Sequence, residues 1–275
     1  MKQQVKQFIK KNIPARYLEI FSSRAIAITK IPKNNAVISD LFVLRCEAGW
    51  ETYFECLDFD RLLNANHDNS TQKLTFCFYS KEGQFIAEKE IILTSAIKTT
   101  LLVNKIASDF NIKEDCLFAI FHPQKKQWIT KHKSFIAERG YIGYANPTKG
   151  IIKGFVHGNL DAIARDGENE KDHLLGNYSF LTKEYRLQHL LDTANSYELF
   201  LVNPTVKAQR FTVLESSKGS SKKTTLIIPS RGLFKYIKAV DKKGDKTTVI
   251  IESKLYLARP IVFKYMPSSF DVFHG

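Results

Sequence analysis

The chain contains a long series of short apolar or alternating segments, and this rhythm is what most constrains its fold. Before residue 124 these segments include KLTFCFYS, EIILT and CLFAIF, and turn-forming stretches such as SKEGQ separate them. The same rhythm returns after residue 177 in segments such as YELFLV, TTLII and PIVFKY. Strands at close spacing with few helical interruptions are typical of β-sandwiches or barrels.

The composition agrees with this interpretation. Hydrophobic residues make up 44% of the 275 residues and charged residues 25%, so the chain can bury a sizeable core. The 20 Phe and 11 Tyr favour pleated, half-buried surfaces. We therefore expect an all-β protein.

The two series of strand-like segments resemble each other in order, and each closes in a similar way. Arg139 and Arg259 are each followed eight residues later by a proline, and then by a His-Gly pair. We expect two tandem antiparallel β-sandwich domains, immunoglobulin-like or jelly-roll-like and related by duplication, over residues 35–170 and 171–275. The polar stretch DAIARDGENEKDHLLGN, which starts at Asp161, is predicted to be the linker.

Residues 1–34 form a basic amphipathic segment that we expect to be partly helical, because apolar residues recur at helical spacing opposite several lysines. Such a segment packs on its own domain or lies on an anionic membrane surface. The segment lacks the apolar core of a signal peptide. The predicted location is therefore cytoplasmic, with peripheral contact to the inner membrane as an alternative.

The formal net charge of +13 is uneven. Residues 206–265 hold about fourteen Lys or Arg against four Asp or Glu. A field of this sign attracts nucleic acid and other polyanions, although lysines also serve as solvated strand faces. Polyanion or nucleic-acid binding through this Lys-rich quarter is one hypothesis.

Common motifs of enzymes and metal sites are missing from the sequence. The four cysteines are not spaced as Cys-x-x-Cys and most lie among apolar neighbours, which favours buried free thiols over a zinc site. The nucleotide-binding glycine motifs and the serine- and zinc-hydrolase signatures are absent as well. We expect no cofactor and no metal, and we favour a protein that is not an enzyme.

The histidines of the two His-Gly pairs are the candidates for acid–base chemistry. His157 and His274 each follow a short Phe/Val stretch, and Asp161 lies four residues beyond His157. Imidazole titrates near neutral pH, so an enzyme could use His157, with Asp161 or His274, as acid or base. The structural alternative is favoured, in which the glycines supply turn freedom after a strand.

The segment WETYFECL predicts a strand with Glu51, Tyr53 and Glu55 on one face. Carboxylates four residues apart on a strand are about 13 Å apart, too far for a glycosidase pair. With Trp50 and Tyr53 they could bind a sugar, since rings stack on sugar faces and carboxylates accept from hydroxyls. A solvated strand face is the simpler alternative.

The segment HPQKKQWITKHKSF interleaves Lys126, Trp128 and His132 and has no counterpart in the second series. Binding residues are often found on loops inserted into a rigid scaffold. Basic side chains next to aromatic rings can bind phosphate groups and stack on bases. Arg139, just beyond this segment, completes the candidate ligand-binding set. The leading hypothesis is a non-catalytic binding or scaffolding protein with a carbohydrate or anionic ligand at the seam between the sandwiches.

Overall fold

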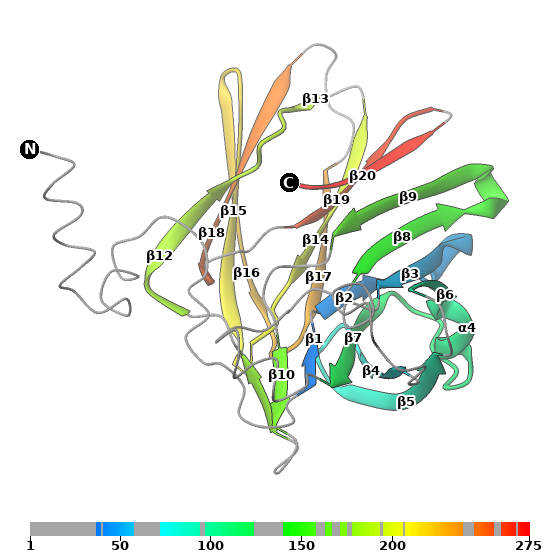
Figure 1. Ribbon diagram of the computed structural model, residues 1–275. Helices are drawn as coiled ribbons and strands as arrows, with labels where there is room; N and C mark the ends of the chain where they lie inside the picture. The colour runs from blue at the N-terminus through cyan, green and yellow to red at the C-terminus, as the bar shows by residue number, and fades with distance from the viewer. Residues whose placement is uncertain are drawn as a thin grey trace, which may run out of the picture.

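The protein is almost entirely β-structure, in four antiparallel sheets of seven, five, four and four strands (Figure 1). The computed structural model describes residues 37–39, 41–57, 72–93, 97–123, 140–157, 163–166, 171–174, 178–192, 195–205, 207–238, 245–255, 260–267 and 269–275. The α-helix among them is α4 (Val103–Ser108). The predicted fold of all-β sandwiches is confirmed, and the predicted N-terminal segment lies outside the described residues.

The first half of the protein, up to Leu174, contains two sheets that pack face to face. The seven-stranded sheet consists of β1 (Val37–Ser39), β2 (Leu41–Leu44), β4 (Gln72–Tyr79), β5 (Phe85–Leu93), β7 (Cys116–Pro123), β10 (Ile163–Asp166) and β11 (Lys171–Leu174). The sheet facing it consists of β3 (Glu51–Leu57), β6 (Lys98–Leu102), β8 (Gly140–Asn146) and β9 (Ile151–His157). The rings of Phe54 on β3 and Phe42 on β2 lie 5.3 Å apart and begin the core between them.

The second half, from Tyr178, contains the other two sheets. One consists of β12 (Tyr178–Arg186), β13 (Leu191–Asp192), β15 (Gln209–Ser217), β16 (Ser220–Ile228) and β18 (Lys246–Leu255). The other, which we call the central sheet, consists of β14 (Ser196–Val202), β17 (Leu233–Lys238), β19 (Ile261–Tyr265) and β20 (Phe270–His274). Phe211 and Ile251 from the first of these sheets share a core with Leu199 of the central sheet.

The middle of the central sheet, at β14 and β19, is buried on both faces. Successive residues of β14 alternate between the two cores: Leu199 and Leu201 belong to the core of the second half, whereas Phe200 and Val202 belong to the core of the first half. A strand buried on both faces is nearly continuously apolar, as the segment LFLV is. The seam between the halves therefore includes a packed hydrophobic layer.

Two turns also interlock across the seam. The turn between β4 and β5 carries Gly83, whose φ of +82° is in the left-handed region. This turn contacts the start of β17, where the backbone N–H of Leu233 donates to the carbonyl of Lys81 at 2.9 Å. A Cβ on Gly83 would overlap the carbonyl oxygen of Ser230, so the close approach requires glycine at this position.

Part of the stretch predicted to be a linker is a hairpin instead. Residues 163–166 and 171–174 form β10 and β11, which extend the seven-stranded sheet through β1. Strands of four residues are too short to give a clear alternating pattern, which is why the sequence did not reveal them. The duplication of the two halves stays a prediction.

Candidate functional site

A pocket of about 290 Å³ opens at the seam, and both halves line it. We call it the seam pocket. Its lining from the first half is Arg45, Glu47, Ala48, Trp50 and Lys149, and from the second half Ser196, Tyr197, Glu198, Lys235, Ile237 and Tyr265. It is close to the lower end of the range of about 300–1,000 Å³ that small-molecule pockets occupy.

One lip of the pocket consists of two interlocked loops. The 3-10 turns η1 (Glu47–Gly49) and η2 (Pro147–Lys149) follow β2 and β8. Ala48 has a φ of +53°, which is uncommon for a residue with a side chain. Asn146 Nδ2 donates to the Ala48 carbonyl at 3.0 Å, while Thr148 Oγ1 donates to Asn146 Oδ1 at 2.6 Å. These hydrogen bonds hold the strained corner and fix the backbone that carries Lys149.

The floor of the pocket is Arg45, which is only 3% exposed. Its NH1 lies 2.8 Å from Glu198 Oε2 and donates to the Tyr265 hydroxyl at 2.7 Å. The hydroxyl in turn donates to the same Glu198 oxygen at 2.6 Å. The guanidinium carbon lies 4.5 Å from the ring centroid of Trp50, at the distance of a cation–π contact. A cation, a carboxylate and a phenol from both halves thus form one closed triangle.

The charges on the floor are fixed over the physiological pH range. Burial disfavours the charged guanidinium, but the oxygens of Tyr265, Glu198 and Asp115 outweigh it and raise the pKa of Arg45. Burial also raises the pKa of Tyr265, and the Glu198 carboxylate adds to this effect. Arg45 is therefore always positive and the phenol always neutral, so the phenol acts as a hydrogen-bond donor to Glu198.

A second group of charges lies beside the floor. Lys235 Nζ is 3.2 Å from Glu47 Oε2 and 3.7 Å from Asp115 Oδ2, and Asp115 Oδ2 is 3.4 Å from Arg45 Nε. Burial alone would raise the pKa of Glu47, but its hydrogen bond to Lys235 and the charge of that lysine lower the pKa. The Glu47 carboxylate is thus ionised near neutral pH. The other oxygen of Asp115 accepts from the backbone N–H groups of Cys46 and Glu47.

Trp50 lies in the seam pocket but not on the face predicted for it. The structure separates it from Glu51 and Tyr53, because Trp50 has the parity of the buried residue Thr52. Trp50 is only 4% exposed, and the guanidinium of Arg45 already covers its ring. Stacking of a ligand on this ring, as the sequence suggested, is therefore not available, and the pocket offers polar and charged groups instead.

Glu51 and Tyr53 lie on the opposite face of β3, where the predicted alternation along the strand is confirmed. The Tyr53 hydroxyl donates to the Glu51 carboxylate. Neighbouring strands add Tyr141 and Phe155 to the same face, since Gly143 pairs with both Tyr53 and Phe155. These residues form a half-exposed surface that is separate from the seam pocket.

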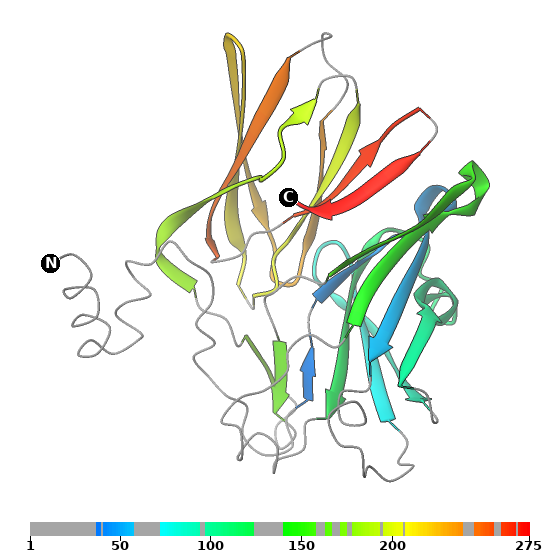
Figure 2. The ribbon, with the colours of Figure 1, turned by 45° about the horizontal axis from the view of Figure 1, so that its top comes forward.

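The remaining predicted site residues divide into two groups. The strands that carry His157 and His274, β9 and β20, lie next to each other, as Figures 1 and 2 both show. Only the backbone of His157 is described, so its relation to the His274 ring stays a prediction. Lying outside the described residues are Lys126, Trp128, His132, Arg139 and Asp161.

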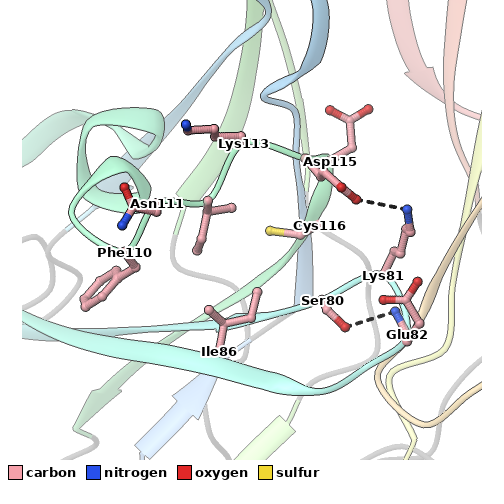
Figure 3. A pocket seen from close by; sticks show the side chains of 11 residues that line it. Ser80, Lys81, Glu82, Ile86, Phe110, Asn111, Lys113, Asp115 and Cys116 are labelled. Carbon is pink, nitrogen blue, oxygen red and sulfur yellow. Dashed lines mark hydrogen bonds and ion pairs between the residues drawn. The ribbon is translucent and has the colours of Figure 1, made fainter.

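A second pocket of about 430 Å³ lies at one end of the first half, between the β4–β5 turn and the start of β7 (Figure 3). Ile86 and Phe110 contribute apolar side chains to it, and the rim includes an ion pair between Lys81 and Glu114 at 2.9 Å. It is larger than the seam pocket, but only one half lines it. The charges on its rim are exposed, and exposed charges contribute little to an interaction because water and salt screen them.

The cysteine thiols near these pockets are not nucleophilic. Burial, with the charges of Asp115 and Glu47, raises the pKa of Cys46 to about 12. Burial likewise raises the pKa of Cys116. The four cysteines are free. Among the described residues, no group of three or more His, Cys, Asp or Glu is arranged to hold a metal ion.

Comparisons with known proteins give little to add to this geometry. No family model matches the chain, and no curated protein matches it. Among solved structures, the chain is similar to the crystal structure of the CupB6 tip adhesin from Pseudomonas aeruginosa at 7% identity and a TM-score of 0.15. That alignment covers 90% of this chain and 86% of the other. In the described part of the chain, no helix has the length and apolarity needed to cross a membrane.

Sequence reasoning missed most of the seam pocket, including Arg45, Glu198 and Lys235. A usable signal existed for two of them. Arg45 ends the apolar run LFVLR, and Glu198 interrupts the apolar run YELFLV. A lone charge inside an otherwise buried strand requires a partner of opposite sign, which makes such residues candidates for a shared site.

Proposed function

We propose that this protein is a non-catalytic binding protein that holds a small polyhydroxylated ligand, such as one sugar residue, in the seam pocket. The observation that carries the proposal is the triangle of Arg45, Glu198 and Tyr265 at the floor of a pocket that both halves line. Fixed donors and acceptors at known positions are what a ligand rich in hydroxyl groups requires.

The seam pocket is favourable for binding rather than for catalysis. Its phenol is neutral, its guanidinium is always charged, and its nearest thiol, that of Cys46, remains protonated. None of these groups exchanges a proton near neutral pH, as a general acid or base must. The hypotheses of a polyanion-binding surface and of acid–base chemistry at His157 stay predictions.

Ligand-observed saturation-transfer NMR with glucose, galactose and N-acetylglucosamine tests the proposal. Tryptophan fluorescence supplies a second readout, because the chain has two tryptophans and Trp128→Phe leaves Trp50 beside the pocket as the only one. We expect at least one sugar to bind with a dissociation constant in the micromolar to millimolar range and to change the emission of Trp50.

A pocket-filling substitution locates the binding. Ser196 is half-buried on β14 and lines the pocket, so Ser196→Phe occupies part of its volume. Ser216→Phe, at an exposed position of β15, is the matched control. We expect the first variant to lose sugar binding and the second to keep it. The proposal is overturned if no sugar binds the folded protein at millimolar concentrations, or if Ser196→Phe binds as the wild type does.

A further inference from the structure

Most of the charged side chains at the seam pocket are paired with one another. Glu198 Oε2 contacts Arg45 and Tyr265, and Glu47 Oε2 contacts Lys235. Asp115, which is 5% exposed behind the pocket wall, contacts Arg45 and Lys235. The carboxylates around the pocket thus already have cationic partners within the protein.

Lys149 differs from the other cations of the pocket. It is exposed at the end of η2, and among the described residues no carboxylate lies within 4.0 Å of its ammonium group. The interlocked loops η1 and η2 fix its backbone at the lip. Lys235, from the other half, is 29% exposed and lines the same pocket. Two cations from opposite halves therefore border the opening, and one of them has no acidic partner among the described residues.

From this arrangement we infer that the preferred ligand is an acidic sugar, whose carboxylate binds Lys149, with Lys235 close by. The inference rests on the proposed function. A carboxylate on the ligand would give Lys149 a charge-assisted hydrogen bond, and such bonds are about twice as strong as neutral ones. The net charge of +13 acts in the same direction, since it raises the local concentration of anions.

A cationic sugar is disfavoured for the same reasons. Its ammonium group would approach the Lys149 charge, and it would compete with Arg45 and Lys235 for Glu198 and Glu47. A neutral sugar brings no carboxylate to Lys149, which pairs with none in the described part of the chain. Acidic, neutral and cationic sugars are therefore expected to bind with three different affinities, and the acidic sugar is expected to bind most tightly.

Titration calorimetry with glucuronate, glucose and glucosamine tests the order. We expect glucuronate to bind about tenfold or more tightly than glucose, a ratio that corresponds to about 1.4 kcal/mol. Acetate and inorganic phosphate are the probes for the anion alone, and we expect both to bind more weakly than glucuronate. Equal affinity for glucose and glucuronate, or tightest binding of glucosamine, overturns the inference and leaves the proposed function standing. Failure of all three sugars overturns the proposed function itself.

Two charge-reversal variants distinguish a direct contact between the ligand and Lys149 from the effect of the net positive charge of the protein. Lys149→Glu changes the lysine at the lip of the pocket, and Lys218→Glu makes the same change of net charge at an exposed position in the turn between β15 and β16. We expect Lys149→Glu to abolish the preference for glucuronate over glucose and Lys218→Glu to retain it. Equal effects of the two variants overturn the assignment of Lys149.

Discussion

The contact between the two turns at the seam can be tested at a single glycine. Gly83 has a φ of +82°, and a Cβ added to it would lie 2.8 Å from the carbonyl carbon of Ser230 and overlap its oxygen. Real Cβ atoms do not approach other heavy atoms closer than 3.0 Å. In Gly83→Ala the two turns must therefore separate, although they are backbone segments with little freedom to move.

The cost of this substitution has three parts. An alanine in the left-handed region costs about 1–2 kcal/mol. Overpacking against a fixed neighbour costs typically about 1–3 kcal/mol more. Separation of the turns also breaks the hydrogen bond from the Leu233 N–H to the Lys81 carbonyl, which contributes about 1 kcal/mol. The expected loss in the free energy of unfolding is therefore about 3–6 kcal/mol.

Gly219→Ala provides the matched control. Gly219 also lies in a hairpin turn and has a φ of +78°, but no atom lies within 4 Å of an added Cβ. This variant carries only the backbone cost of about 1–2 kcal/mol. In urea titrations followed by circular dichroism, the midpoint should fall by about 1–2 M for Gly83→Ala and by about half a molar for the control. Equal midpoints for the two variants would refute the turn contact.

Three further predictions concern buried or perturbed groups. Asp115→Asn removes one carboxylate from the buried Arg45 and should lower the free energy of unfolding by about 3 kcal/mol. Glu90→Gln, in an exposed pair with Lys73, should change it by less than about 1 kcal/mol. Urea titration measures both. Burial would raise the pKa of Asp192, but hydrogen bonds from Lys264, Tyr197 and Asn195 lower it to about 2. The ionised carboxylate therefore stabilises the folded protein fully above its unfolded pKa of about 3.9, and this stabilisation is lost as the pH falls towards 2. Asp192→Asn should therefore differ from the wild type in urea midpoint at pH 6 and converge with it as the pH falls below 4, and a constant difference would contradict this. With a pKa of about 12, Cys46 should react slowly with a disulfide reagent at pH 8 in the folded protein. In urea all four thiols should react rapidly. Rapid labelling of Cys46 in the folded state would contradict its burial.

The fold class could be predicted from the sequence because strand patterns are local. Alternation along β3 places Thr52, Phe54 and Cys56 inside, as expected from the segment ETYFECL. The apolar segment of β14 predicted a strand as well, but not its partners. Whether such a strand is covered by one layer or by two depends on contacts between distant segments, and here two cores share one sheet.

The seam pocket could not be predicted for a related reason. Arg45, Glu198 and Lys235 are far apart in the sequence, and only the packing of the central sheet against the first half brings them together. Sequence reasoning singled out residues with conspicuous chemistry, such as Trp50, and placed that ring on the wrong face of β3. The parity of positions 50 and 52 would have corrected this, because residues two apart on an extended backbone share a face.

A tripeptide that recurs in the chain explains how the loops at the seam keep their positions. Asn-Pro-Thr occurs at residues 146–148 and 203–205, and both asparagines are fully buried. In each copy the threonine hydroxyl donates to Oδ1 of the asparagine, at 2.6 Å and 2.7 Å. This hydrogen bond orients the amide so that its Nδ2 can donate to carbonyl groups of another loop.

The two copies act on opposite sides of the seam. The Nδ2 of Asn146 holds Ala48 at the lip of the seam pocket, whereas that of Asn203 donates to the carbonyls of Ile228 and Pro229, next to the segment that Gly83 contacts. The copies follow β8 and β14, whereas the duplication hypothesis pairs β8, the strand after Arg139, with β19, the strand after Arg259. The recurrence is therefore explained by a shared local task. A buried asparagine satisfies carbonyl groups where two loops meet away from water, and the seam requires this on both of its sides.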